Sequence, residues 1–161
     1  MSNVSSNVAI GDLAPDFDLE TDTGDRLSLG SLLGKTVILY FYPKDDTPGC
    51  TTEACGFRDL FPRFSAGDAV ILGVSPDSVA SHVKFKQKFA IPFPLLADED
   101  HAVAERYGVW VEKTLYGRKS MGIERTTFII GPDGKVKRVF AKVKADGHAE
   151  EVASALADLG L

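Results

Sequence analysis

The two cysteines of the chain are the side chains best suited to chemistry. The sequence of 161 residues contains only Cys50 and Cys55, and both lie in the polar stretch TPGCTTEACGF that directly follows an apolar run. A chain of this length can bury a core of its own and does not need a disulfide to fold. The two cysteines could simply be inert small residues, but their position after a strand and at the start of a helix favours a reactive thiol.

The pattern predicts that Cys50 lies in the first turn of a helix. Thr47 is the expected N-cap, and Pro48 is the expected first helical residue. Only the ionised thiolate is nucleophilic, and the unpaired amides and positive dipole end of a helix N-terminus favour that anion. Charged side chains of both signs flank the position, so the backbone donors are expected to provide most of the stabilisation.

The spacing of the cysteines limits how they can pair. Five residues along an intact α-helix correspond to a rise of about 7.5 Å and a Cα separation of about 8–9 Å, with the side chains on different sides. A disulfide needs a Cα separation below about 7 Å. Cys50 and Cys55 therefore never pair, or they pair only after the first turns unwind. Gly56 fits either a helix that melts locally or a close packing contact.

The remaining pattern predicts one α/β domain over residues 1–161, with residues 1–9 as a flexible leader. Its order predicts a mixed central sheet with helices on both faces and an N-terminal β-hairpin around the Thr-Gly-Asp turn. Pro62 is expected to end or kink the first long helix. The predicted strands are 37–42, 69–74, 95–97, 126–130 and 136–143, and the predicted later helices are 78–90, 100–107 and a closing amphipathic helix that includes 152–159.

Composition excludes several classes of function. The 18 basic and 23 acidic residues give a formal charge of −5, which argues against nucleic acid or an anionic membrane surface as the partner. The apolar runs are too short to cross a bilayer, and the first residues show no secretory signal. The expected compartment is the cytoplasm.

The three histidines do not show metal-ligand spacing. His82, His101 and His148 are far apart and are flanked by surface-type residues, so they are expected to be exposed or to cap helices. Two cysteines with a distant histidine also fall short of a structural zinc set. No metal and no organic cofactor is predicted.

Several collinear segments resemble one family. The run from Pro43 to Cys50 matches the peroxiredoxin pattern Pro-x-x-x-Thr-x-x-Cys, and FYPKDDTPGCTTEACGFRD resembles the peroxiredoxin Q, or bacterioferritin comigratory protein, subfamily. The segments GDLAPDFDL, FPLLADEDHAVAERYGVW, MGIERTTFIIGPDGKV and GHAEEV extend the resemblance over nearly the whole chain. The resemblance implies a thioredoxin-like fold and a thiol peroxidase that acts on hydrogen peroxide and organic hydroperoxides.

The same resemblance implies a role for each matching residue. Cys50 matches the peroxidatic cysteine, and Cys55 matches the resolving cysteine that forms an intramolecular disulfide with it. Thr47 matches the hydroxyl that bonds the thiolate and the peroxide, and Pro43 matches the residue that shields the site from water. Arg125 matches the arginine that holds the thiolate and the substrate oxygens. Thioredoxin or glutaredoxin is the implied reductant.

Two other classes of function remain open at this point. A thioredoxin-type thiol–disulfide carrier would share the fold, but that class uses Cys-x-x-Cys, whereas four residues separate the cysteines here. A non-catalytic holdase or interaction module is the other alternative. Loss of thiols on addition of peroxide distinguishes a peroxidase from both.

The chain lacks an extended C-terminal arm, so a monomer or a weak homodimer is expected.

Overall fold

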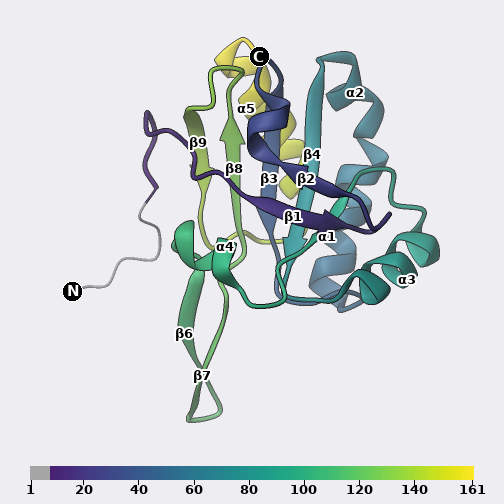
Figure 1. Cartoon of the computed structure of the whole chain (residues 1–161), viewed down its shortest axis with the longest axis vertical. Helices are drawn as coiled ribbons and strands as arrows, with labels where there is room; N and C mark the ends of the chain where they lie inside the picture. The colour runs from purple at the N-terminus through teal and green to yellow at the C-terminus, as the bar shows by residue number, and fades with distance from the viewer. Residues whose placement is uncertain (1–7) are drawn as a thin grey trace.

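The computed structural model describes residues 8–161, which form a sheet covered by helices on two sides (Figure 1). The elements, in chain order, are β1 (Asp18–Thr21), β2 (Arg26–Ser28), the 3-10 helix η1 (Leu29–Leu32), β3 (Thr36–Phe41), α1 (Pro48–Asp59), α2 (Phe61–Ala66), β4 (Ala69–Ser75), α3 (Val79–Phe89), β5 (Leu95–Ala97), α4 (Ala102–Arg106), β6 (Trp110–Leu115), β7 (Arg118–Ile123), β8 (Thr126–Ile130), β9 (Val136–Phe140) and α5 (His148–Leu159).

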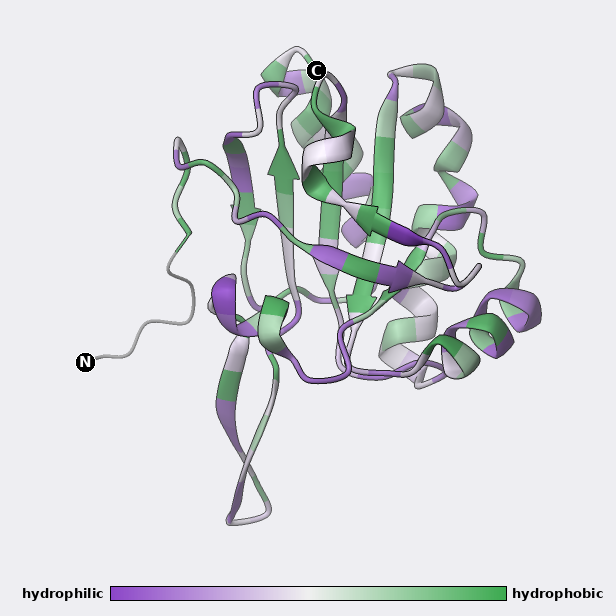
Figure 2. Ribbon diagram, in the orientation of Figure 1, coloured by the Kyte–Doolittle hydropathy of each residue, from purple (hydrophilic) through white to green (hydrophobic). Residues whose placement is uncertain are grey.

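The main sheet is mixed, as the pattern predicts. Its strand order is β2-β1-β5-β4-β3-β8-β9. The three central strands β3, β4 and β5 run parallel, whereas β1 and β8 pair antiparallel to their neighbours. Figure 2 shows that β3, β4 and β8 are hydrophobic over most of their length, as strands buried on both faces must be.

Alternation along β3 divides the core into two layers. Ile38 and Tyr40 point to the face covered by α1, α2, α3 and α5, and this layer contains Cys50. Val37 and Leu39 point to the opposite face, where η1 and α4 cover the sheet. The expected helices on both faces are confirmed. The loop that leads to the cysteines leaves from the C-terminal end of β3.

The N-terminal β-hairpin is confirmed and is joined to the main sheet. β1 and β2 pair around Gly24, whose φ of 87° requires a left-handed conformation that glycine adopts freely. β1 also pairs with β5, so the hairpin extends the sheet at its edge. Of the predicted leader 1–9, residues 1–7 lie outside the described part of the chain. Val8 is buried in the core, which contradicts the prediction at that position.

Most predicted boundaries agree with the structure within two or three residues. α1 ends at Asp59, and Pro62 lies in the first turn of the following α2, so the interruption expected near this proline is present. The last predicted strand is too long, because β9 ends at Phe140. Among the helices of residues 8–161, none has the length and apolar character that crossing a bilayer requires.

A second, two-stranded sheet was not predicted. β6 and β7 form a hairpin that projects away from the main sheet (Figure 1). Its turn consists of Tyr116 and Gly117, both with positive φ, as in the tight two-residue turns that suit the twist of a hairpin. Because most side chains of these strands are exposed, the apolar alternation that marks a strand in the sequence is missing.

The expectation that the histidines are exposed or capping is wrong for two of them. His82 and His148 are buried, at 0% and 1% exposure. Each is hydrogen-bonded through both ring nitrogens, which offsets the cost of removing a polar ring from water. His101 stays partly exposed and stacks on Trp110 with ring centroids 3.9 Å apart.

Candidate active site

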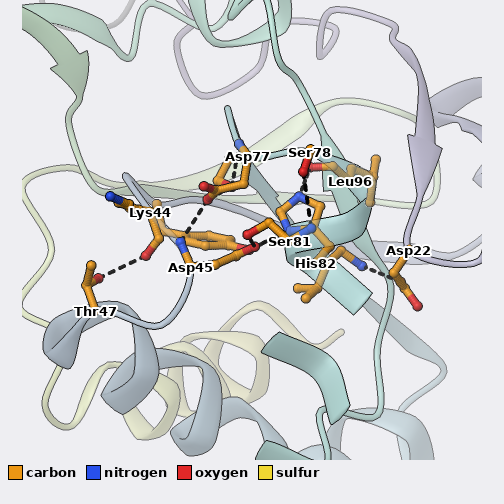
Figure 3. Close-up of polar contacts among 12 residues, drawn as sticks. Asp22, Lys44, Asp45, Thr47, Asp77, Ser78, Ser81, His82 and Leu96 are labelled. Carbon is orange, nitrogen blue, oxygen red and sulfur yellow. Dashed lines mark hydrogen bonds and ion pairs between the residues drawn. The ribbon is translucent and has the colours of Figure 1, made fainter. Parts of the chain in front are cut away.

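The loop between β3 and α1 sets the start of the helix that carries both cysteines. Thr47 has extended backbone at the N-cap position, and Pro48 follows as the first helical residue, as predicted. The Thr47 hydroxyl donates to the carbonyl oxygen of Lys44 at 2.9 Å and does not cap the helix amides (Figure 3). The amides of the first turn are therefore not satisfied by the Thr47 side chain.

Cys50 lies in the first turn of α1, and its side chain meets Arg125. The thiol is only 1% exposed, and Arg125 Nη2 donates to Cys50 Sγ at 3.3 Å. Arg125 immediately precedes β8, whose first residue Thr126 pairs with Phe41 at the end of β3. Since α1 begins shortly after β3 ends, this pairing brings the guanidinium to the helix N-terminus. A cation and a helix N-terminus both stabilise a thiolate.

Glu53 is a third member of the site that the sequence analysis did not identify. It lies three residues after Cys50, on the same face of α1. Its side chain is 0% exposed, and its Oε1 accepts from Arg125 Nη1 at 2.6 Å. Arg125 thus uses one nitrogen for the thiol and the other for the carboxyl. The i, i+3 spacing of Glu53 from Cys50 was the available signal.

Burial dominates the electrostatics of this group. It raises the pKa of Glu53 to about 7, although the guanidinium of Arg125 opposes the shift. The second oxygen of Glu53 and the hydroxyl of Tyr40 are buried and find no hydrogen-bond partner within residues 8–161. Burial lowers the pKa of Arg125, but the Glu53 carboxyl and the Cys50 thiol together outweigh this effect, so that the pKa is raised. The guanidinium therefore keeps its charge while the carboxyl exchanges a proton near neutral pH.

Substituting Glu53 by glutamine should change how stability depends on pH. The folded-state pKa of about 7 lies above the ordinary value of 4.5, so the folded protein holds a proton that the unfolded chain releases between these values. The contribution of Glu53 to the stability of the fold is therefore fully present below about pH 4.5 and is lost as the pH rises to about 7. We expect Glu53→Gln to remove about 3 kcal/mol of this dependence.

Urea denaturation of the wild type and Glu53→Gln between about pH 5 and pH 8 measures this effect. The exposed Glu112 provides the matched control, since Glu112→Gln removes a carboxyl that is already in water. The difference between wild type and Glu53→Gln should grow with pH, in favour of the variant. A parallel pair of stability curves would contradict the assigned burial effect.

Gly49 gives Arg125 the room to reach the thiol. A Cβ at this position would lie 3.1 Å from Arg125 Nη2. Alanine is also the better helix former by roughly 1 kcal/mol. We therefore expect Gly49→Ala to keep or improve stability while it displaces the guanidinium and slows the reaction of Cys50 with peroxide by about tenfold.

Gly56→Ala is the matched control on the same helix. A Cβ at Gly56 would lie 3.3 Å from the Cβ of Ala149 on α5 and would not approach Arg125. This variant should lose stability and keep the peroxide rate, the reverse of Gly49→Ala. Stopped-flow kinetics and thermal unfolding of both variants separate the two effects. Equal peroxide rates in wild type and Gly49→Ala would show that Gly49 has no part in placing the guanidinium.

Cys55 faces a different part of the surface from Cys50. Both thiols are free, and α1 runs unbroken through them. Cys55 is half-buried beside a groove of about 320 Å³ between α1 and the start of α5. Of the two interpretations of Gly56, the structure shows the close packing contact, against Ala149 in α5. The two sulfurs cannot meet across the intact helix.

Pro43 and Thr47 lie on the loop beside the helix start. Pro43 follows the end of β3, and both side chains are half-buried. Within residues 8–161 no hydrogen bond joins Thr47 to Cys50, because the hydroxyl bonds Lys44. The same part of the chain holds no group of three or more His, Cys, Asp and Glu side chains arranged for a metal ion. The chemistry of the site thus centres on a thiol, a guanidinium and a carboxyl.

The sequence comparisons agree with this geometry. Residues 10–139 match the model of the AhpC/TSA family. The chain is 55% identical over 150 residues to the putative peroxiredoxin bcp of Coxiella burnetii, covering 93% of this chain and 99% of that protein. It is 49% identical over 152 residues to peroxiredoxin Bcp of Bacillus subtilis, covering 94% and 97% of the two chains.

Solved structures share the fold over the same length. The bacterioferritin comigratory protein of Xanthomonas campestris, studied for alkyl peroxide reduction, superposes with a TM-score of 0.89 at 40% identity, covering 97% of this chain and 99% of that chain. A cysteine-to-serine mutant of the Xylella fastidiosa protein PrxQ gives a TM-score of 0.91 at 39% identity, with coverage of 97% and 99%. The chain has the thioredoxin-type fold of these peroxiredoxins and belongs to the AhpC/TSA family.

Proposed function

We propose that Cys50 is the peroxidatic thiol of a peroxiredoxin that reduces hydrogen peroxide and organic hydroperoxides. The observation that carries the proposal is the contact of Arg125 Nη2 with the buried Cys50 Sγ at 3.3 Å. The thiolate attacks the terminal peroxide oxygen, the S–O bond forms as the O–O bond breaks, and the sulfur becomes a sulfenic acid. The leaving oxygen takes up one proton and departs as water or an alcohol.

The neighbouring groups would stabilise the charge that develops in this step. Negative charge passes from the sulfur to the leaving oxygen, and the Arg125 guanidinium is a rigid fork that can donate to both. Thr47 would offer its hydroxyl to the peroxide after leaving the Lys44 carbonyl. Pro43 would limit the access of water. The apolar layer behind Cys50 strengthens these interactions, because fewer waters compete for the same donors.

Cys55 is the proposed resolving thiol. It condenses with the Cys50 sulfenic acid, so that an S–S bond forms and one water leaves. Because α1 is intact and the thiols face different sides, its first turns must unwind before this step. An external dithiol of the thioredoxin or glutaredoxin class would then reduce the disulfide and restore both thiols.

The setting of the reaction follows from the same residues. We propose that residues 1–161 act as one domain, as a monomer or a weak homodimer, in the cytoplasm. The substrate range rests on the Xanthomonas campestris relative, whose structures concern alkyl peroxide reduction. No metal or organic cofactor enters the proposed cycle.

Thiol counting with mass spectrometry after one equivalent of peroxide tests the proposal. The reduced protein should lose both thiols rapidly and form one intramolecular Cys50–Cys55 disulfide per peroxide. A thiol–disulfide carrier would instead remain reduced in peroxide and exchange only with disulfides. A holdase would show neither reaction. A covalent dimer linked through the cysteines would contradict the intramolecular assignment.

A further inference from the structure

A buried polar cluster fastens the loop that precedes α1. We call it the loop anchor, and it consists of Tyr42, Asp45, Ser81 and His82. Asp45 belongs to the loop, whereas Ser81 and His82 belong to α3, and Figure 3 shows their side chains meeting beside the loop. Asp45 and His82 are buried, with His82 at 0% exposure. None of the steps proposed for Cys50 uses these side chains.

Asp45 is the centre of the loop anchor. Its Oδ1 accepts from the Tyr42 hydroxyl at 2.6 Å, and its Oδ2 lies 2.8 Å from Ser81 Oγ and 2.7 Å from His82 Nδ1. Its backbone amide donates to Asp77 Oδ2 at 2.7 Å. Burial raises the pKa of Tyr42 well above its ordinary value, so the phenol remains a donor. Three donors on one buried carboxyl fit its ionised form.

His82 faces an acceptor with each of its ring nitrogens. Nδ1 lies against the Asp45 carboxylate, and Nε2 lies 2.9 Å from the carbonyl oxygen of Leu96 in β5. A neutral imidazole has a single N–H and would leave one of these buried acceptors facing a lone pair, which costs free energy. The imidazolium donates to both. The nearby Lys86 of α3 is paired with Asp22 and not with the anchor.

The anchor acts on the stretch of chain that places the catalytic groups. Asp45 lies midway between Pro43 and Thr47, and Cys50 follows in the next turn. Asp46 has a φ of 57°, a left-handed conformation that persists where the surroundings fix the backbone. The Lys88–Asp46 ion pair is exposed on both sides and contributes little. The buried contacts of Asp45 therefore hold this loop on α3.

We propose that His82 is a positioning residue that holds the loop through Asp45 and so places Thr47 and the start of α1 for attack of Cys50 on peroxide. This role rests on the proposed function of Cys50. It also divides the site into a part that stays fixed on α3 and a part, the first turns of α1, that must unwind for the disulfide to form.

The hydrogen bonding of His82 gives a direct test on the unaltered protein. Nitrogen-15 NMR of the reduced protein should show hydrogen on His82 Nδ1, the nitrogen that faces the Asp45 carboxylate at 2.7 Å. Absence of hydrogen from Nδ1 would overturn the proposal.

Kinetics of two variants test the link to the reaction. In His82→Gln the amide NH2 can take the place of only one ring nitrogen, so the amide oxygen would face the other acceptor, and in Asp45→Asn the carboxylate is lost. We expect the rate of Cys50 oxidation per folded molecule to fall about 10–100-fold in either variant. The later condensation with Cys55 should be much less affected. Because the two side chains act through one contact, the double variant should be no slower than the slower single variant.

Lys86→Met is the matched control on α3. It removes the ion pair with Asp22, which joins α3 to the turn after β1 and touches no residue of the loop. This variant should lose stability and keep the peroxide rate. Unchanged oxidation rates in folded His82→Gln and Asp45→Asn would refute the positioning role while leaving the peroxidase proposal intact. A wild-type Cys50 that did not react with peroxide would instead contradict the proposed function itself.

Discussion

Cys55→Ser is expected to react once with peroxide at the wild-type rate and then to stop. The side chain of Cys55 lies on the groove between α1 and α5 and not beside Arg125, so its loss should not disturb attack by Cys50. Without a second thiol the sulfenic acid has no partner in the chain. Mass spectrometry should show the gain of one oxygen atom on Cys50, and steady-state turnover should fall by at least about 10³-fold.

The complementary variant Cys50→Ser should show no reaction with peroxide at all, because the serine hydroxyl is a far weaker nucleophile than a thiolate. Its remaining thiol, Cys55, should stay reduced over the time in which the wild type is fully oxidised. Rapid oxidation of Cys55 in this variant would exchange the roles assigned to the two cysteines. The roles assigned to the two cysteines require that peroxide oxidises Cys50 at the same rate in the wild type and in Cys55→Ser.

Arg125→Met should lower the rate of the first step by about 10²–10³-fold, the usual cost of losing a donor that stabilises developing charge. The methionine fills a similar volume without charge or hydrogen bonds. Arg125→Lys keeps the charge but loses the fork that reaches both Cys50 and Glu53, and it should recover only part of the rate.

Stopped-flow measurement of peroxide consumption by the three proteins checks this order. A double variant that also changes Glu53 provides the control. Removal of Arg125 leaves the buried Glu53 carboxyl without its cation and shifts this carboxyl further toward its neutral form. Glu53→Gln in the Arg125→Met background should therefore restore stability without restoring the rate. A first-step rate in Arg125→Met equal to that of the wild type would remove the guanidinium from the mechanism.

Local pattern was sufficient for much of the fold. The strands buried on both faces, such as β3 and β4, were predicted correctly, because nearly every residue in them is apolar or small. The hairpin of β6 and β7 was missed because its side chains face solvent, and only the Tyr116–Gly117 turn marked it. The partly exposed hairpin of β1 and β2 was predicted instead from its Thr-Gly-Asp turn.

The site was harder to derive, because its members are distant in the chain. Arg125 reaches Cys50 through the pairing of β8 with β3, and nothing in the spacing of the two residues indicates that pairing. The family resemblance supplied it. Glu53, by contrast, follows Cys50 by one helical turn and could have been placed on the same face. The burial of His82 was not predicted because the nearby residues Ser81 and Lys84 are polar, although Phe85 lies on the same buried face of the helix.

The central claim is that the Arg125 guanidinium, which donates to Cys50 Sγ at 3.3 Å, makes Cys50 the thiol that attacks peroxide. Stopped-flow measurement of the oxidation of Cys50 by one equivalent of hydrogen peroxide, in Cys55→Ser and in Cys55→Ser with Arg125→Met, tests this on proteins with a single thiol. The further substitution should slow the oxidation by about 10²–10³-fold. Equal rates of oxidation in the two proteins would contradict the account.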